Sequence, residues 1–228
     1  MATRVLLVGH GRMGRLVESL SAGHDVEIAG YVDRGSARNP ESWPEAEVAI
    51  DFSTADAVPG NVRHLAARGV SIVIGTTGWS VHEPELRREI AACGIGVVAA
   101  PNFAPGVHVL AALVARAAEL LAAQDGFGAW IHEAHHAAKR DAPSGTALLL
   151  ESTMRDAGYG RAIDLSSTRA GSIPGTHTIG FDSAGETITV THTARDRSAF
   201  ARGALDAARW VRGRHGWFTR RDVFAAQS

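Results

Sequence analysis

The 228-residue chain has one cysteine, one lysine and almost no net charge. Because Cys93 has no partner for an internal disulfide, the chain fits a reducing compartment, and we expect a cytoplasmic location. The formal net charge of −1 lacks the basic excess that proteins bound to DNA or RNA phosphates usually carry. We therefore expect no nucleic-acid partner.

Long apolar runs are missing as well. No uninterrupted stretch approaches the ~18–20 apolar residues of a membrane helix. The N-terminus shows no charged segment followed by a small-residue cleavage site, so we expect neither a membrane partner nor secretion. The hydrophobic fraction of 45% and the charged fraction of 21% are ordinary for a globular protein and exclude disorder as the main theme.

The first half of the chain alternates short apolar runs with helical patterns. Strand and helix in alternation predict parallel pairing with right-handed crossovers, so we predict a Rossmann-like, doubly wound parallel α/β sheet. The strands are expected at residues 4–8, 26–32, 47–52, 70–75 and 95–99, and the helices at 13–21, 55–68 and 83–92.

The second half has a different texture. After a long apolar helix at 107–123 come extended, Thr- and Ser-rich runs at 129–134, 166–170, 177–182 and 186–194. This pattern predicts a second α+β domain with a mixed or antiparallel sheet. An amphipathic helix at 198–214 is expected to return to the first domain, and arginines in the tail (Arg209, Arg212, Arg214, Arg220, Arg221) are expected on a solvated helix face. The predicted domains are 1–103 with 198–228, and 104–197.

A glycine-rich loop follows the first predicted strand and opens a helix. Glycines let the backbone approach a pyrophosphate closely, and a helix N-terminus directs N–H groups toward it. Asp33 lies 19 residues after Gly14, where an acid commonly binds the adenosine ribose, while Arg34 suits a 2′-phosphate. The loop, which predicts dinucleotide binding, consists of Gly9, His10, Gly11, Arg12, Met13 and Gly14.

Two further loops follow the fourth and fifth predicted strands. Ligands of open α/β sheets lie beyond the carboxyl ends of the strands, so we expect both loops to contact the nicotinamide half of the cofactor. Their residues are Gly75, Thr76 and Thr77, and then Ala100, Pro101, Asn102 and Phe103.

The segment from His132 to Thr146 is the densest in reactive side chains. It contains His132-Glu133-x-x-His136, the spelling of a zinc-protease helix. The preceding residues indicate a strand, on which these two histidines would lie roughly 13 Å apart, too far for one ion. We therefore expect no metal.

The same segment fits an anion site with a proton donor. Lys139 is the one lysine in a chain that otherwise uses arginine, which suggests a role for a compact ammonium group. Two neighbouring histidines offer a donor near physiological pH, and His132 is our candidate for a structural one. Ser144-Gly145-Thr146 opens the next helix, whose N–H groups suit a carboxylate.

In order along nearly the whole chain, these motifs resemble the 4-hydroxy-tetrahydrodipicolinate reductase (dihydrodipicolinate reductase) family. The segment between Arg34 and Asp51 is shorter than in many members, and His108 stands where asparagine is usual. The resemblance rests on residues 9–14, 51–53, 75–78, 101–107, 133–146, 171–177 and 192–204.

The resemblance implies an NADH- or NADPH-dependent reductase of a small cyclic dicarboxylate in the diaminopimelate route to lysine, assembled as a homotetramer through the sheet of the second domain. His135 would be the proton donor and Lys139 the second catalytic residue. His136, Gly145 and Thr146 would bind the substrate carboxylate. The glycine loop, Asp33, Arg34 and the two later loops would bind the cofactor.

Two alternatives stay open at this stage. Another two-domain amino-acid dehydrogenase, such as one acting on aspartate, would keep the glycine loop without needing the His-His-x-x-Lys string. A non-catalytic nucleotide sensor would keep residues 9–14 and Asp33 and leave His135 and Lys139 free to vary.

Overall fold

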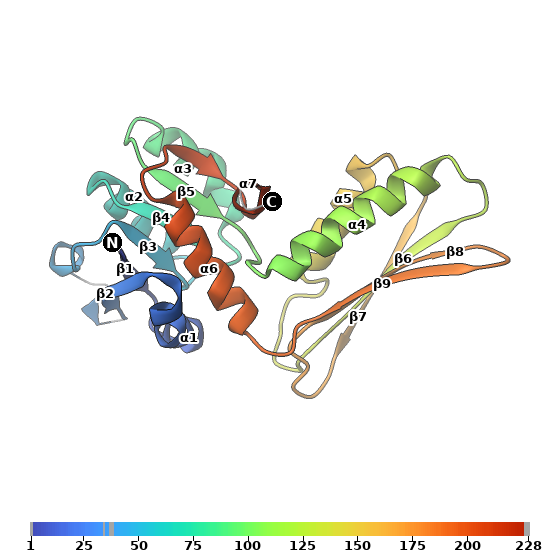
Figure 1. Cartoon of the computed structure of the whole chain (residues 1–228), viewed down its shortest axis with the longest axis horizontal. Coiled ribbons are helices and arrows are strands. Elements are labelled where there is room, and N and C mark those ends of the chain that lie inside the picture. The colour runs from blue at the N-terminus through green and yellow to red at the C-terminus, as the bar shows by residue number, and fades with distance from the viewer. Residues whose placement is uncertain (1, 34, 37–38, 226–228) are drawn as a thin grey trace. The chain divides into compact units, whose positions relative to one another are not determined.

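The computed structural model describes residues 2–33, 35–36 and 39–225 (Figure 1). The chain divides into two compact units, which we call unit 1 (Met1–Ala104 with Ser198–Ser228) and unit 2 (Pro105–Arg197). The boundary expected from the sequence lay one residue earlier, between 103 and 104. Arg34, one of the predicted cofactor residues, lies outside the described residues.

Unit 1 is a six-stranded, all-parallel sheet in the order β10-β5-β4-β3-β1-β2. The central strands are short apolar runs buried on both faces, as parallel sheets require. The strands are β1 (Thr3–Val8), β2 (Val26–Val32), β3 (Val48–Asp51), β4 (Ser71–Ile74), β5 (Gly96–Ala99) and β10 (Gly216–Phe218).

Helices cover both faces of this sheet (Figure 1). Helices α1 (Arg12–Leu20) and α6 (Ser198–Val211) share one apolar core with alternate residues of β1 and β3. Helices α2 (Val58–Ala67) and α3 (Glu83–Ile90) pack against the opposite face. The predicted Rossmann-like, doubly wound sheet is therefore confirmed.

Unit 2 is a four-stranded mixed sheet with two helices on one face. Its order is β7-β6-β8-β9, with β6 and β7 parallel and the other pairs antiparallel. The predicted second α+β domain with a mixed sheet is confirmed. Its elements are α4 (Pro105–Ala122), β6 (Gly128–His135), α5 (Gly145–Asp156), β7 (Ile163–Arg169), β8 (Thr176–Asp182) and β9 (Thr187–Thr193).

Helix α4 is long and apolar enough to cross a membrane, judged by length and composition alone. Charged residues interrupt it at Arg116 and Glu119, and one stripe, which includes Leu110 and Val114, is buried against α5 and the sheet. Of this stretch, 22% is buried inside the structure, so α4 packs against unit 2 by one face.

The C-terminal segment differs from the expectation. The helix expected at 198–214 ends at Val211, and after it β10 pairs with β5 at the edge of the sheet, followed by α7 (Arg220–Ala225). Arg220, expected on a solvated face, is buried to 1% exposure and its Nε donates to the carbonyl of Phe103 at 3.3 Å. A three-residue strand that begins with a glycine is too short for periodicity to detect.

Candidate functional site

The sheet register of unit 1 brings the predicted cofactor residues to one edge. Val32, Val8, Asp51, Ile74 and Ala99 are partners across five neighbouring strands. The residues that follow them are Asp33, Gly9, Phe52, Gly75 and Ala100, so the three expected cofactor loops leave the sheet at its carboxyl edge. The strand order reverses direction between β1 and β3, which is where open α/β sheets bind their ligands.

The glycine loop has the backbone that a pyrophosphate needs. Gly9 has φ +92°, and a Cβ at Gly9 or Gly14 would collide with the backbone of Phe52 or of Gly9 respectively. A Cβ on Gly11, by contrast, would have no other atom within 4 Å. Because Gly11 caps α1 without a side-chain hydrogen bond, the helix N-terminus is left to a ligand.

Asp33 and Tyr31 flank this loop at the end of β2. Asp33 directly follows β2, in a tight turn in which its Oδ1 accepts from the N–H groups of Gly35 (2.8 Å) and Ser36 (3.0 Å). These bonds, that from Ser36 foremost, lower the pKa of Asp33, so its carboxylate is ionised. The His10 ring stacks on Tyr31 with 4.1 Å between centroids.

A buried carboxylate organises the next loop. Asp51 is fully buried at the end of β3, where it accepts hydrogen bonds from Ser53 (N–H 2.8 Å, Oγ 2.6 Å), Thr76 (Oγ1 2.9 Å) and Asn61 (2.8 Å). The bond from Thr76 ties the loop after β4 to the loop after β3. Asp51 therefore positions a predicted cofactor residue.

The loop after β5 presents backbone more than side chains. Asn102 is 8% exposed and its Oδ1 accepts from the N–H of Ala104 at 2.8 Å. The Phe103 side chain is 1% exposed and belongs to the core between the sheet, α1 and α6. Of this loop, Pro101 is the exposed residue.

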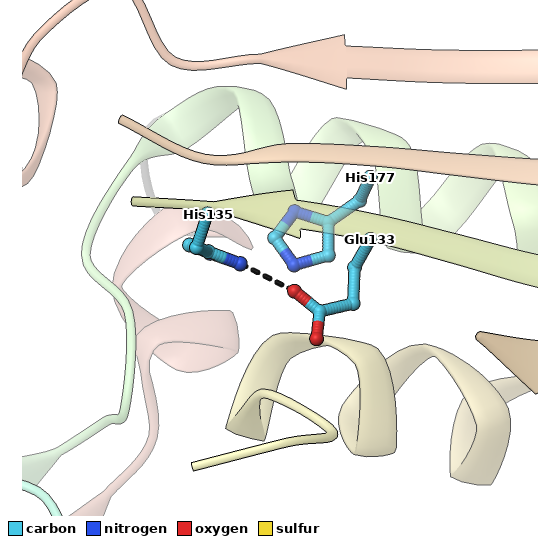
Figure 2. Close-up of side chains that lie close together, drawn as sticks. All are labelled: Glu133, His135 and His177. Atoms are coloured by element: carbon cyan, nitrogen blue, oxygen red, sulfur yellow. Dashed lines mark hydrogen bonds and ion pairs between the residues drawn. The ribbon is translucent and has the colours of Figure 1, made fainter. Parts of the chain in front are cut away.

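In unit 2 the strand β6 delivers a histidine and a glutamate to the same face (Figure 2). His135 Nδ1 and Glu133 Oε2 form a short hydrogen bond, and Arg169 from β7 grips both oxygens of Glu133 at 2.6 and 2.9 Å. Burial raises the pKa of Glu133, but hydrogen bonds from Arg169, Ser167 and His135 outweigh it and lower the pKa to about 2. Glu133 is therefore a buried, ionised carboxylate.

A second histidine packs against His135. His177 on β8 is 3% exposed and packs edge-on against His135 with 5.1 Å between ring centroids. Its Nε2 lies 3.1 Å from the Oγ of Ser144, which also accepts from the N–H of Ala147 and so caps α5. Burial, followed by the charge of His135, lowers the pKa of His177 to about 4, so this ring is neutral at pH 7.

The remaining predicted site residues of unit 2 lie in the loop between β6 and α5 and at the start of α5. The Nζ of Lys139 lies 2.7 Å from both carboxylate oxygens of Asp141, and Lys139 acts electrostatically on His135. His136 Nε2 lies 3.3 Å from Arg197. Gly145 and Thr146 form the first turn of α5, directly after Ser144, where partial positive charge favours a carboxylate.

The strand predicted through His132 is confirmed, but it ends at His135, so His136 lies just beyond it. His132 contacts Ser166 at 3.0 Å. One other group in the described chain, Glu133, His135 and His177, has ligand atoms within 4.8 Å of one another. Because Arg169 already occupies both oxygens of Glu133, the chemistry there favours an ion pair over a metal cation.

Sequence reasoning missed several members of these networks. The sequence marks Glu133 and Asp51 only as parts of motifs, and it does not indicate that Arg169 contacts Glu133 or that Ser144 contacts His177. The signal for Glu133 was present, since residues i and i+2 of a strand share a face. The partners from β7 and β8 are set by strand pairing, which local sequence does not specify.

Comparisons with known proteins agree with this arrangement. The family model for the dihydrodipicolinate reductase N-terminus matches residues 3–103, and the model for the C-terminus of the same family matches residues 106–224. The 4-hydroxy-tetrahydrodipicolinate reductase of Thiobacillus denitrificans is 37% identical over 98% of both chains. That of Christiangramia forsetii is 32% identical over 97% of both.

A solved structure shares the fold. Dipicolinate-bound dihydrodipicolinate reductase from Paenisporosarcina superposes with a TM-score of 0.74 at 22% identity, covering 96% of this chain and 98% of that one. Two family models that together span almost the whole sequence, and relatives matched end to end, leave one assignment. This chain belongs to the dihydrodipicolinate reductase family of pyridine-nucleotide-dependent oxidoreductases.

Proposed function

We propose that this protein uses NADH or NADPH to reduce 4-hydroxy-tetrahydrodipicolinate to tetrahydrodipicolinate, in the biosynthesis of diaminopimelate and lysine. The observation that carries the proposal is the cluster in unit 2. It combines an imidazole on a buried carboxylate, an ammonium group and a helix N-terminus, which are the groups a cyclic imine dicarboxylate requires.

Unit 1 binds the dinucleotide in this proposal. The glycine loop and the N-terminus of α1 hold the pyrophosphate, while Asp33 binds the adenosine ribose. The loops at Gly75–Thr77 and Ala100–Phe103 contact the nicotinamide half, with Phe103 contributing backbone. The bound dinucleotide supplies a hydride.

The residues of unit 2 bind and protonate the substrate. His136 and the first N–H groups of α5, at Gly145 and Thr146, hold a ring carboxylate, and Lys139 adds a cation beside the ring. Hydride addition at C4 of the conjugated imine places negative charge toward C3 and the ring nitrogen. His135 then gives a proton, a contribution typically worth about 10²–10⁴-fold in rate.

We further propose a homotetramer that acts in the cytoplasm. One face of the sheet in unit 2 is covered by α4 and α5, whereas the opposite face carries Trp130 lying over Gly180 and threonine pairs such as Thr178–Thr191 (3.1 Å). A sheet face of this kind suits pairing with a second copy.

The test is a coupled assay. The substrate is generated in place by the aldol condensation of pyruvate with aspartate semialdehyde, and the loss of reduced-nicotinamide absorbance is followed with NADH and with NADPH in turn. We expect oxidation that depends on the condensing enzyme and is unaffected by a chelator. Oxidation of the reduced dinucleotide with aspartate-derived imines instead, or no oxidation at all, would contradict the proposal. Inhibition by a chelator would indicate that the site holds a metal.

A further inference from the structure

We propose that Glu133 is a positioning residue that fixes the tautomer of His135, keeping the proton on Nδ1 and reserving Nε2 for exchange with the substrate. The role of Nε2 in catalysis rests on the proposed function. The tautomer of His135 is a property of the protein without ligands, so it can be tested independently of the proposed function.

The two ring nitrogens of His135 have different surroundings. Nδ1 points at the carboxylate of Glu133, as Figure 2 shows, and an ionised carboxylate only accepts hydrogen bonds, so Nδ1 must carry the hydrogen. Nε2 lies beside the main chain of Gly175, where an added Cβ would be 3.1 Å away. A glycine at that position, with φ +150°, keeps the approach to Nε2 open.

Glu133 is itself held in one orientation. It is 0% exposed, and the two bonds from Arg169 clamp both of its oxygens in a planar, bidentate pair. Arg169 is fixed in turn by donating to the carbonyl of Asp141 at 2.5 Å. A carboxylate that cannot rotate aims its hydrogen bond in a fixed direction, so the imidazole plane is fixed as well.

The other groups facing His135 do not compete for Nδ1. They are Arg169 on β7, His177 on β8 and Lys139 in the following loop. Two are cations, which only donate. His177 contacts Ser144 through Nε2, and its Nδ1 has no hydrogen-bond partner among the described residues, so Glu133 is the acceptor for Nδ1 of His135. Burial lowers the pKa of His135 and the hydrogen bond to Glu133 restores part of it, which keeps the imidazolium accessible as a proton donor.

A purely structural Glu133–Arg169 ion pair makes different predictions. In the variant Glu133→Gln, Arg169 still demands the single amide oxygen, so the amide N–H₂ group turns toward Nδ1 of His135. Nδ1 must then accept, and the neutral ring shifts to the Nε2–H form. A pair that served only to join β6 to β7 would leave the ring unchanged as long as the unit stayed folded.

The experiment measures the ring ¹⁵N shifts of His135 by NMR in the full-length protein, assigned with His135→Gln. We expect an Nδ1–H neutral form in the unchanged protein. In Glu133→Gln we expect an Nε2–H form, a His135 pKa lower by about one unit or more, and a kcat lower by about 10²-fold with its pH profile displaced toward acid. The matched control is Asp156→Asn, which removes an exposed carboxylate from α5 and should change none of these.

Two results would overturn the inference. One is an Nε2–H tautomer in the unchanged protein, a measurement that needs no variant to fold. The other is a folded Glu133→Gln variant whose tautomer and His135 pKa match those of the unchanged protein. A correct tautomer together with no reductase activity in the coupled assay would reject the proposed function and leave the positioning role of Glu133 intact.

Discussion

Lys139 shows how one residue type can be singled out by the rest of the composition. Among 23 lysines and arginines it is the one lysine, and its ammonium pairs with Asp141 in the loop that leads to α5. An ammonium is a compact point charge, whereas a guanidinium is a planar fork, so the two place charge differently near a ring.

Lys139→Ala is therefore expected to lower kcat by about 10²-fold, because a cation near the developing negative charge is lost. NADH binding, measured by fluorescence titration, should be unchanged, since the dinucleotide loops belong to unit 1. Arg140→Ala, which removes the neighbouring exposed cation, serves as the control. Weaker NADH binding in Lys139→Ala would instead assign the residue to the dinucleotide site.

Asp33 bears on the choice between the two dinucleotides. Three of its hydrogen bonds fall on Oδ1, and within the described part of the chain Oδ2 accepts none. In the proposed function, Oδ2 would accept from a ribose hydroxyl and would repel a 2′-phosphate.

We expect Asp33→Ala to weaken NADH binding by about tenfold, the value of roughly one hydrogen bond to a charged group, and to weaken NADPH binding less. Calorimetric titration with both dinucleotides measures the difference. Glu27→Ala on the same strand is an exposed control. If the ratio of the NADH and NADPH affinities is unchanged in Asp33→Ala, Asp33 does not contact the ribose.

His177 couples the stability of unit 2 to pH. Burial lowers its pKa to about 4, while an unfolded histidine titrates near 6.5. Between about pH 6.5 and 4 the histidine is protonated in the unfolded chain but neutral in the folded chain. Its full contribution to the free energy of unfolding is therefore present above pH 6.5 and is lost as the pH falls toward 4. The loss amounts to about 3 kcal/mol at most.

Urea unfolding between about pH 7 and pH 4.5 should show this loss, and His177→Gln should flatten it. The acid loss due to Glu133 lies mostly lower, between its ordinary pKa of 4.5 and about 2, and meets the loss due to His177 only at the acid end of this range. His82→Gln, at an exposed position of unit 1, is the control. An equal pH dependence in His177→Gln would show that other groups produce it.

At the scale of elements, the end of β3 holds the loop after β4. The carboxylate of Asp51 is fully buried and accepts four hydrogen bonds, one of them from Thr76. Two short strands are thereby joined where the cofactor is proposed to bind.

Asp51→Ala should lower the free energy of unfolding by about 3 kcal/mol, because several buried donors lose a charged acceptor. It should also raise the KM for NADH, since the loop at Gly75–Thr77 is no longer fixed. Thermal and urea unfolding together with steady-state kinetics test both effects. Asp56→Ala removes an exposed carboxylate nearby as a control. A stable variant with an unchanged KM would contradict the role of Asp51.

At the scale of the whole molecule, the sheet of unit 2 has two unlike faces. The face under α4 and α5 carries Ile131, Ile179 and Phe181, whereas the alternate residues on the other face are mainly threonine, with Trp130. Alternate side chains of the same strand thus form the hydrophobic core on one face of the sheet and the proposed subunit contact on the other.

Four copies of the 24.0 kDa chain would sediment at about 96 kDa. Symmetry repeats any added charge in every contact, so Thr178→Glu should dissociate the assembly, while Val81→Glu, on unit 1 at 80% exposure, should not. Analytical ultracentrifugation distinguishes the outcomes. A monomeric unchanged protein, or a Thr178→Glu variant of full mass, would contradict the tetramer.

Much of this protein could be predicted from its sequence because its signals are local. Apolar runs of five or so residues gave the strands of unit 1, and glycines at close approaches such as Gly9 and Gly14 marked the loop after β1. The string from Glu133 to Thr146 singled out, without any knowledge of the fold, the residues of unit 2 that we propose to react.

What only the tertiary structure decided depends on pairing between distant segments. β10 was missed because three residues carry no periodicity, and Arg220 was misplaced because its burial follows from that strand and from the backbone of Phe103. The local sequence places Glu133 and His135 on one face of a strand. It cannot say that β7 brings an arginine to that glutamate or that β8 brings His177 to that imidazole, because strand order is settled by the packing of the whole sheet.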